Sequence, residues 1–155
     1  MTVQDPLFWL GLGVSILCGA FIGIERQFRR KPAGIRTSIL FCMGTQVFVR
    51  LGVLLAGDQG DPSRVLGQVI TGIGFLGAGV ILTRQGTVTG LTSASVVWVT
   101  AAIGAVAGLN LYAEALALTL ATVVLLVSVQ KVEEVFGFRE EHRGDSSRGL
   151  PTDSG

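Results

Sequence analysis

The stretch 71–82, TGIGFLGAGVIL, decides the fold of this chain, because it places four glycines within eight residues and carries no charge. Its G-x-G-x-x-G spacing matches the dinucleotide-binding fingerprint, which also needs a preceding strand and an acidic residue about twenty positions later. The residues before it are too few for a strand and a turn, and no Asp or Glu lies between Asp61 and Glu114. We therefore interpret the glycines as a means of close helix packing in a membrane.

The composition around this stretch supports a membrane protein. Hydrophobic residues make up 49% of the 155 residues and charged residues only 15%, which is too apolar for an ordinary soluble domain. Five stretches have the length of about 17–25 mainly apolar residues that a transmembrane helix needs: 7–24, 35–56, 65–82, 92–108 and 111–130. We expect an all-α integral membrane bundle of about five transmembrane helices over residues 1–131, and a polar, disordered cytoplasmic tail over 132–155.

The basic residues predict the orientation of this bundle. Ten of the twelve Lys and Arg residues fall on one side of a five-span chain: Arg26, Arg29, Arg30, Lys31, Arg36, Arg84, Lys131, Arg139, Arg143 and Arg148. Only Arg50 and Arg64 fall toward the other side. Because cytoplasmic loops are enriched in Lys and Arg, we expect the N-terminus outside the cell and the C-terminus in the cytoplasm.

Small residues recur at every fourth position in two of the expected spans. These series are Gly11, Ser15, Gly19 and Gly23 in the first span, and Thr100, Gly104 and Gly108 in the fourth. Residues four apart share one helix face, and a smooth face lets helix backbones approach closely in lipid. Two interpretations are open, since such a face serves either packing within the chain or, for the first span, formation of a homodimer.

The glycines of the third span spread around more than one helix face: Gly67, Gly72, Gly74, Gly77 and Gly79. This distribution predicts a central helix that other helices contact on several sides. The alternative is a helix broken by its glycines, like the discontinuous helices that line the pathways of transporters.

Charged residues at membrane depth need a partner or a purpose. Arg50 and Glu114 lie at comparable depth near the outer ends of the second and fifth spans, so we predict a pair or a bridged contact between them. The alternative is that Arg50 extends to the outer headgroups. Glu25 is predicted to pair with Arg36 near the cytoplasmic face, with Arg26 and Arg84 as competing partners of the same carboxylate. Asp61, which precedes Pro62, is predicted to cap the third helix.

Residue patterns that carry catalytic or metal chemistry are not found in the sequence. His142 is the lone histidine, and no nucleophile triad, phosphate loop or metal-binding spacing occurs. Cys18 and Cys42 lie in apolar runs and are interpreted as small hydrophobic residues. We expect a protein that is not an enzyme, with no cofactor, no metal site and no nucleic-acid partner.

Blocks of sequence in a fixed order resemble the MgtC/SapB family. They are GIERQ at 23–27, AGIRT at 33–37, DPSR at 61–64, GIGFLGAGVI at 72–81, VTGLTSA at 88–94 and WVTAAIG at 98–104. The resemblance implies a bacterial inner-membrane protein of about five helices that is linked to growth under magnesium limitation and, in pathogens, to survival inside macrophages.

Larger members of that family are reported to restrain the proton-driven ATP synthase and to influence phosphate uptake, rather than to carry magnesium. They also have a soluble C-terminal domain with an ACT-like fold. This sequence departs from them there, because the residues after Lys131 are few and polar, so we carry over no function of that domain.

Two functions follow from the sequence and the resemblance. The first is a regulatory protein that contacts other membrane proteins through its helices, and the second is a small oligomeric transporter or ion-permeation unit for Mg²⁺ or protons. The candidate functional residues are Glu25, Arg26, Arg36, Thr37, Asp61, Arg64, Arg84 and Thr92. The candidate packing residues are Gly19, Gly23, Gly72, Gly74, Gly77, Gly79 and Gly104.

Overall fold

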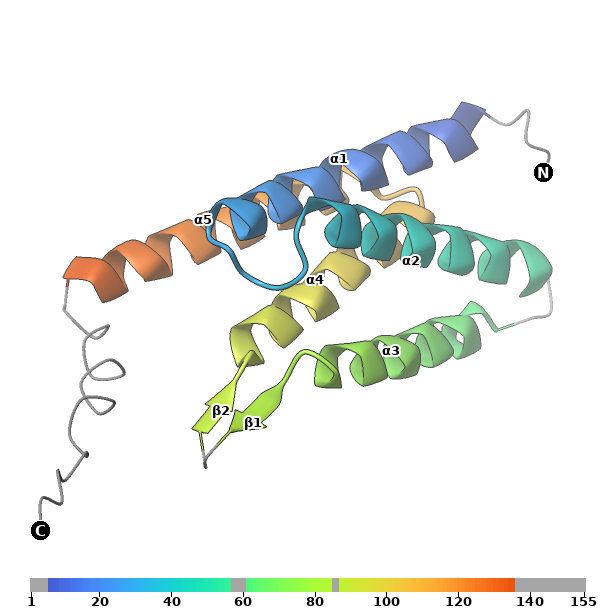
Figure 1. Ribbon diagram of the computed structural model, residues 1–155. Coiled ribbons are helices and arrows are strands. Elements are labelled where there is room, and N and C mark those ends of the chain that lie inside the picture. The colour runs from blue at the N-terminus through green and yellow to red at the C-terminus, as the bar shows by residue number, and fades with distance from the viewer. Residues whose placement is uncertain (1–5, 57–60, 85–86, 136–155) are drawn as a thin grey trace, which may run out of the picture. The chain divides into compact units, whose positions relative to one another are not determined.

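The computed structural model describes residues 6–56, 61–84 and 87–135, which form five helices and one short hairpin (Figure 1). The elements are α1 (Pro6–Phe28), α2 (Ile35–Ala56), α3 (Pro62–Ala78), β1 (Leu82–Arg84), β2 (Thr87–Thr89), α4 (Leu91–Gly108) and α5 (Tyr112–Val135). Helices α1, α2, α4 and α5 are long and apolar enough to cross a membrane, and α3, with 17 residues, lies at the short end of the spanning range. The prediction of an all-α membrane protein is confirmed.

Several predicted boundaries differ from those of the structure: α1 extends beyond Ile24 to Phe28, and α3 begins at Pro62 rather than at Val65. The third span ends at Ala78 rather than Leu82, because Leu82 begins the strand β1, which pairs antiparallel with β2 through Leu82 and Thr89. Residues 132–135 of the predicted tail continue α5, and 136–155 lie outside the described residues. The orientation of the bundle in the membrane stays a prediction.

The hairpin leads into α4 through a position that only glycine can occupy. Gly90 has a φ of 92°, in the left-handed region, and a Cβ atom there would overlap the carbonyl oxygen of Val80. A residue with a side chain would be strained by its backbone and by this contact. Gly90 therefore joins the hairpin tightly to the end of α3.

Within the compact unit Met1–Val123, α2 lies between α1 and α4 and forms the main contacts with both. Figure 1 shows α1, α2 and α3 running side by side, with α4 behind them. The most deeply buried apolar side chains of this unit include Cys18, Ile22, Cys42, Val97 and Ile103. We call the end with the α1–α2 loop and the hairpin the α1–α2 end, and the end with the α4–α5 turn the opposite end.

Glycines on α1 and α4 allow the close approach to α2. A Cβ atom on Gly23 would lie 2.5 Å from Ile35 Cα, and one on Gly19 would lie 2.7 Å from Ile39 Cα. On the other side, a Cβ atom on Gly104 would overlap the backbone of Cys42, and one on Gly108 would lie 2.8 Å from the carbonyl oxygen of Gln46. The fourth-position series of the first span thus faces α2 of its own chain.

The central position predicted for the third span is wrong. Among the described residues, no atom lies within 4 Å of a Cβ placed on Gly72 or Gly74. Gly77 faces α4, at 3.7 Å from the carbonyl oxygen of Ala94, and Gly79 follows the last residue of α3 as its C-cap. The physical reason is that α2 takes the central place by its glycine contacts with α1 and α4, so that α3 lies at the edge. Helix α3 is continuous over Pro62–Ala78, which excludes the broken-helix alternative.

Candidate functional site

A buried pair of charged residues lies at the α1–α2 end, on the last turn of α1. Arg26 is 1% exposed and donates from Nη2 to Ser93 Oγ at 2.5 Å, in the first turn of α4. Its Nε and Nη1 atoms have no acceptor among the described residues. Glu25 beside it is 8% exposed and forms an ion pair with Arg29, Nε to Oε1, at 2.6 Å. The partner of Glu25 is therefore Arg29, one turn later on the same helix, and the predicted first candidate, Arg36, is wrong.

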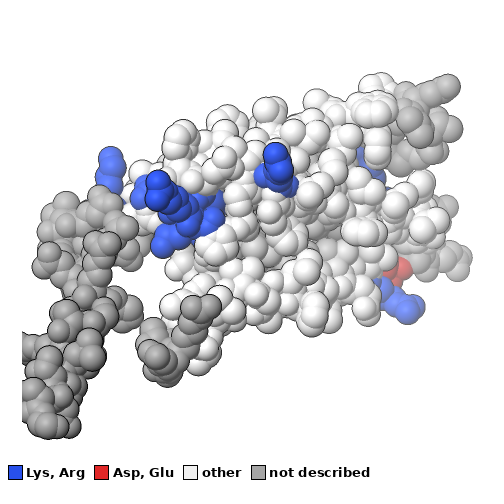
Figure 2. Space-filling model, viewed as in Figure 1, with Lys and Arg blue, Asp and Glu red and all other residues white. Residues whose placement is uncertain are grey.

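The other residues predicted for this face are spread over its surface. Arg36 and Thr37, in the first turn of α2, and Thr92, in the first turn of α4, are exposed. The backbone of Arg84 belongs to β1, and its side chain lies outside the described part of the chain. Figure 2 shows blue side chains over the loop that joins α1 to α2, whereas most of the remaining described surface in this view is white. Among the predicted functional residues whose side chains are described, Glu25 and Arg26 are the two that are buried.

A hydrogen-bonded cluster at the opposite end surrounds Arg50. Its Nη1 atom donates to Asn110 Oδ1 at 2.7 Å and to the carbonyl oxygen of Leu7 at 3.2 Å. The Tyr112 hydroxyl donates toward the same two acceptors, at 2.9 Å each, and the guanidinium carbon lies 5.9 Å from the centre of the Phe8 ring. The cluster joins the start of α1, the end of α2 and the α4–α5 turn.

The predicted pair of Arg50 and Glu114 is wrong. Asn110 has a φ of 65°, and this left-handed turn brings its side chain to Arg50, whereas Glu114 lies on an exposed face of α5. The alternative, that Arg50 extends to the headgroups, also fails, because Arg50 is only 5% exposed. Asparagine often adopts the left-handed conformation directly after the end of a helix. The position of Asn110 after the fourth apolar run could therefore have predicted this turn from the sequence.

A polar stripe along α2 was also missed, although its spacing is regular. Ser38, Cys42, Gln46 and Arg50 follow one another at every fourth position, and all four are buried. Both side-chain amide atoms of Gln46 lack a partner among the described residues, as does Ser15 Oγ on α1. Buried polar groups usually bind a protein group or an ordered water, so the interface of α1 and α2 has unused hydrogen-bonding capacity at mid-depth.

Asp61 and Arg64 lie where the sequence analysis expected, at the start of α3. Asp61 is the N-cap, and its Oδ1 accepts from the backbone N–H of Ser63 at 2.9 Å. Hydrogen bonds from Ser63, with a smaller effect of the Arg64 charge, lower the pKa of the Asp61 carboxyl. Both residues are exposed, and the prediction that Asp61 caps this helix is confirmed.

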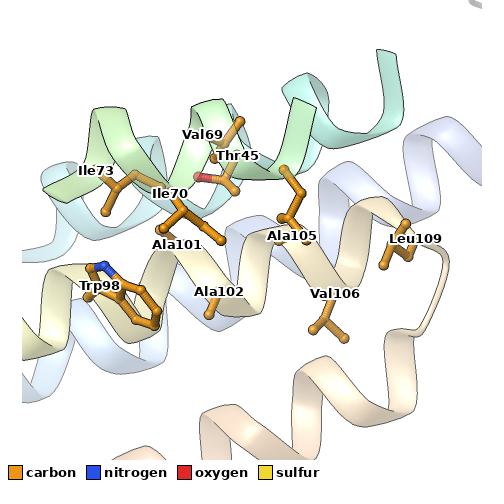
Figure 3. A pocket seen from close by; sticks show the side chains of 11 residues that line it. Thr45, Val69, Ile70, Ile73, Trp98, Ala101, Ala102, Ala105, Val106 and Leu109 are labelled. Carbon is orange, nitrogen blue, oxygen red and sulfur yellow. The ribbon is translucent and has the colours of Figure 1, made fainter. Parts of the chain in front are cut away.

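An apolar pocket of about 220 Å³ lies between α3 and α4. Figure 3 shows its side chains converging from three helices. They include Thr45 of α2, Val69, Ile70 and Ile73 of α3, Trp98, Ala101, Ala102, Ala105 and Val106 of α4, and Leu109 directly after α4. Thr45 is the one polar side chain in this lining. A second, larger cavity lies next to it, between α3 and α2, and shares Thr45, Val69 and Ile73 with the first. Helix α3 is therefore packed loosely against both α2 and α4.

The described residues contain no group of three or more His, Cys, Asp or Glu side chains that could hold a metal ion. Two clusters of hydrogen-bonded charged residues lie instead around Arg26 at one end and Arg50 at the other. Charge-assisted hydrogen bonds fix α1 to α4 at the first end, and fix α1, α2 and the α4–α5 turn to one another at the second.

Comparisons with known proteins agree with the blocks of sequence described above. A model of the MgtC family matches residues 12–135. A Brucella abortus (strain 2308) relative named "Protein MgtC" is 38% identical over 133 residues, which cover 86% of this chain and 56% of the relative. An Escherichia coli (strain K12) relative named "Putative magnesium transporter YhiD" is 50% identical over 105 residues, which cover 63% of this chain and 48% of the relative.

The "Protein MgtC" of Salmonella typhimurium (strain LT2) is 38% identical over 130 residues, which cover 81% of this chain and 55% of the relative. The chain thus spans about half the length of the curated relatives it matches. No solved structure gives a significant match.

Proposed function

Because the chain belongs to the MgtC family, we propose that it is a regulatory protein of the bacterial inner membrane that acts under Mg²⁺ limitation. It is not an enzyme, and it acts by helix contacts with other membrane proteins. The magnesium-transporter name of the E. coli relative supports the link to Mg²⁺.

The observation that carries the regulatory role is an open stripe of small residues on α3. Gly67, Thr71, Gly74 and Ala78 are all exposed and follow one another at three- and four-residue steps, so they share one helix face. No described atom lies within 4 Å of a Cβ placed on Gly67 or Gly74. The Thr71 hydroxyl is already bonded to the carbonyl oxygen of Gly67 at 2.9 Å. A helix of another membrane protein can approach such a face closely, as small-residue interfaces in lipid do.

The backbone of α3 favours regulation over transport. Transporters commonly bind their substrates where unwound helices leave backbone groups free, whereas α3 is helical throughout Pro62–Ala78. The side chains that line the pocket beside it are hydrocarbon apart from the Thr45 hydroxyl and the Trp98 indole nitrogen, which is a donor and not a metal ligand. A divalent cation needs oxygen ligands, and this lining offers it a single hydroxyl.

The second candidate is a small oligomeric transporter or ion-permeation unit. Arg26, Gln46 and Ser15 are buried within the apolar helices and keep unpartnered polar atoms among the described residues. Ionisable and polar groups at membrane depth often mark ion pathways. This observation keeps transport as the alternative.

Filling the α3 stripe tests the regulatory role. We expect Gly67→Leu combined with Gly74→Leu to leave the protein folded, because both positions face open space. The new side chains would hold a partner helix away and weaken its binding by about 5- to 150-fold, for a steric cost of about 1–3 kcal/mol. The measurement is growth at limiting Mg²⁺ of a strain that lacks its own copy and carries the variant.

The matched control is Gly13→Leu on α1, which also meets no described atom within 4 Å. It should support growth like the unchanged protein at an equal amount in the membrane. Full growth with the doubly substituted α3 would contradict the proposed role of this stripe.

A further inference from the structure

A lengthwise groove lies between α2 and α3, next to the pocket of Figure 3, with which it shares Thr45, Val69 and Ile73. Its cavity volume is about 480 Å³. The groove is lined by Leu40, Gly44 and Phe48 of α2 and by Gln68, Gly72 and Leu76 of α3, among others. Each set of three follows at every fourth position, so the groove runs along both helices for more than two turns.

The two glycines make this groove deep. No described atom lies within 4 Å of a Cβ placed on Gly44 or on Gly72. They lie in the middle of the two facing series, where side chains would otherwise close the gap between the helices. Since neither glycine supports a close backbone contact, in contrast to Gly104, both leave space for a molecule that is not part of the described chain.

A cationic side chain lies at one end of the groove. Arg36 is one turn before Leu40 on α2, and residues four apart share a helix face. It is exposed and has no ion pair or hydrogen bond among the described residues. Because helical side chains tilt toward the helix N-terminus, we expect its guanidinium to extend beyond the apolar groove at the α1–α2 end.

We propose that this groove binds one anionic phospholipid, with an acyl chain along Gly44 and Gly72 and the phosphate on Arg36. A methylene chain is narrow enough to lie within the groove. A transmembrane helix, about 10–12 Å across, would rest over it and leave it unfilled. The guanidinium selects an anionic headgroup, and its forked donors match phosphate oxygens. This site is independent of the small-residue stripe, which lies on another face of α3.

The test uses native mass spectrometry of the full chain in detergent, with phosphatidylglycerol or phosphatidylcholine added. We expect one phosphatidylglycerol to be retained, with about fivefold preference over phosphatidylcholine, the factor for about 1 kcal/mol per basic side chain near an anionic group. Arg36→Gln should remove this preference without changing the fold, because the residue is exposed. Gly44→Leu with Gly72→Leu should abolish retention of the lipid.

Two matched variants serve as controls. Lys31→Gln removes an exposed charge of the same loop, and Gly13→Leu adds a side chain in open space on α1; both should bind phosphatidylglycerol as the unchanged protein does. Equal binding of the two lipids by the unchanged protein, or an unaltered preference in Arg36→Gln, would overturn the proposal. The proposal would also be overturned if the unchanged protein formed a dimer and Gly44→Leu with Gly72→Leu dissociated it, because a second copy of the chain would then occupy the groove.

Discussion

Gly104→Ala is expected to destabilise the bundle by about 3 kcal/mol or more, the upper range of the cost of overpacking a core. The added methyl group would overlap the carbonyl oxygen of Cys42 and lie 2.9 Å from its carbonyl carbon. Backbone atoms cannot move aside as the end of a flexible side chain can, so α4 would have to separate from α2 along its length. The measurement is the thermal unfolding midpoint in detergent.

Gly13→Ala is the control for this prediction, because it places the same methyl group on a transmembrane helix where no described atom lies within 4 Å. Its midpoint should equal or slightly exceed that of the unchanged protein, since alanine favours a helix more than glycine does. Equal midpoints for the two variants would mean that α2 and α4 do not pack through Gly104.

Arg50→Met is expected to have the second largest effect, a loss of about 2–3 kcal/mol of stability. The substitution keeps an unbranched side chain in place of the apolar stem of Arg50 and removes the charge-assisted hydrogen bonds to Asn110 and to the carbonyl oxygen of Leu7. The loss should appear as a lower unfolding midpoint, with α1 detaching first at its N-terminal end.

Glu114→Gln is the matched variant for Arg50→Met. Glu114 is exposed and belongs to no described ion pair. The stability of the Glu114→Gln variant should therefore stay within about 0.5 kcal/mol of that of the unchanged protein. If Glu114→Gln destabilised the protein as much as Arg50→Met, the two side chains would act as a pair. The hydrogen bonds of Arg50 in the cluster around Asn110 would then not explain its contribution to stability.

The features of the fold that depend on local sequence could be predicted. Apolar runs of spanning length gave the helices, and Asp61 before Pro62 gave the start of α3. The fourth-position spacing from Gly19 to Gly23 predicted a shared helix face, because helix periodicity alone decides which residues share a face, and both glycines lie against the backbone of Ile35 to Ile39. The family followed from ordered blocks of sequence, and the family model confirms it.

Features that depend on which helices meet could not be predicted from spacing. Gly72 and Gly104 look alike in the sequence, yet one faces open space and the other faces the backbone of Cys42. The partner of Arg50 depends on the left-handed turn at Asn110, which brings a residue close that lies far away in the sequence. Similar depth in the membrane suggested Glu114 as the partner of Arg50. Depth does not specify which way a helix face points, and Glu114 lies on an exposed face of α5.

The most direct test of the regulatory role is the flux of Mg²⁺ and of protons into liposomes that contain the purified full chain. We expect the rate to equal that of liposomes without protein, because regulation by helix contacts moves no ion. A protein-dependent flux of either ion that Glu25→Ala abolishes would contradict the regulatory role and assign the buried charges of α1 to transport.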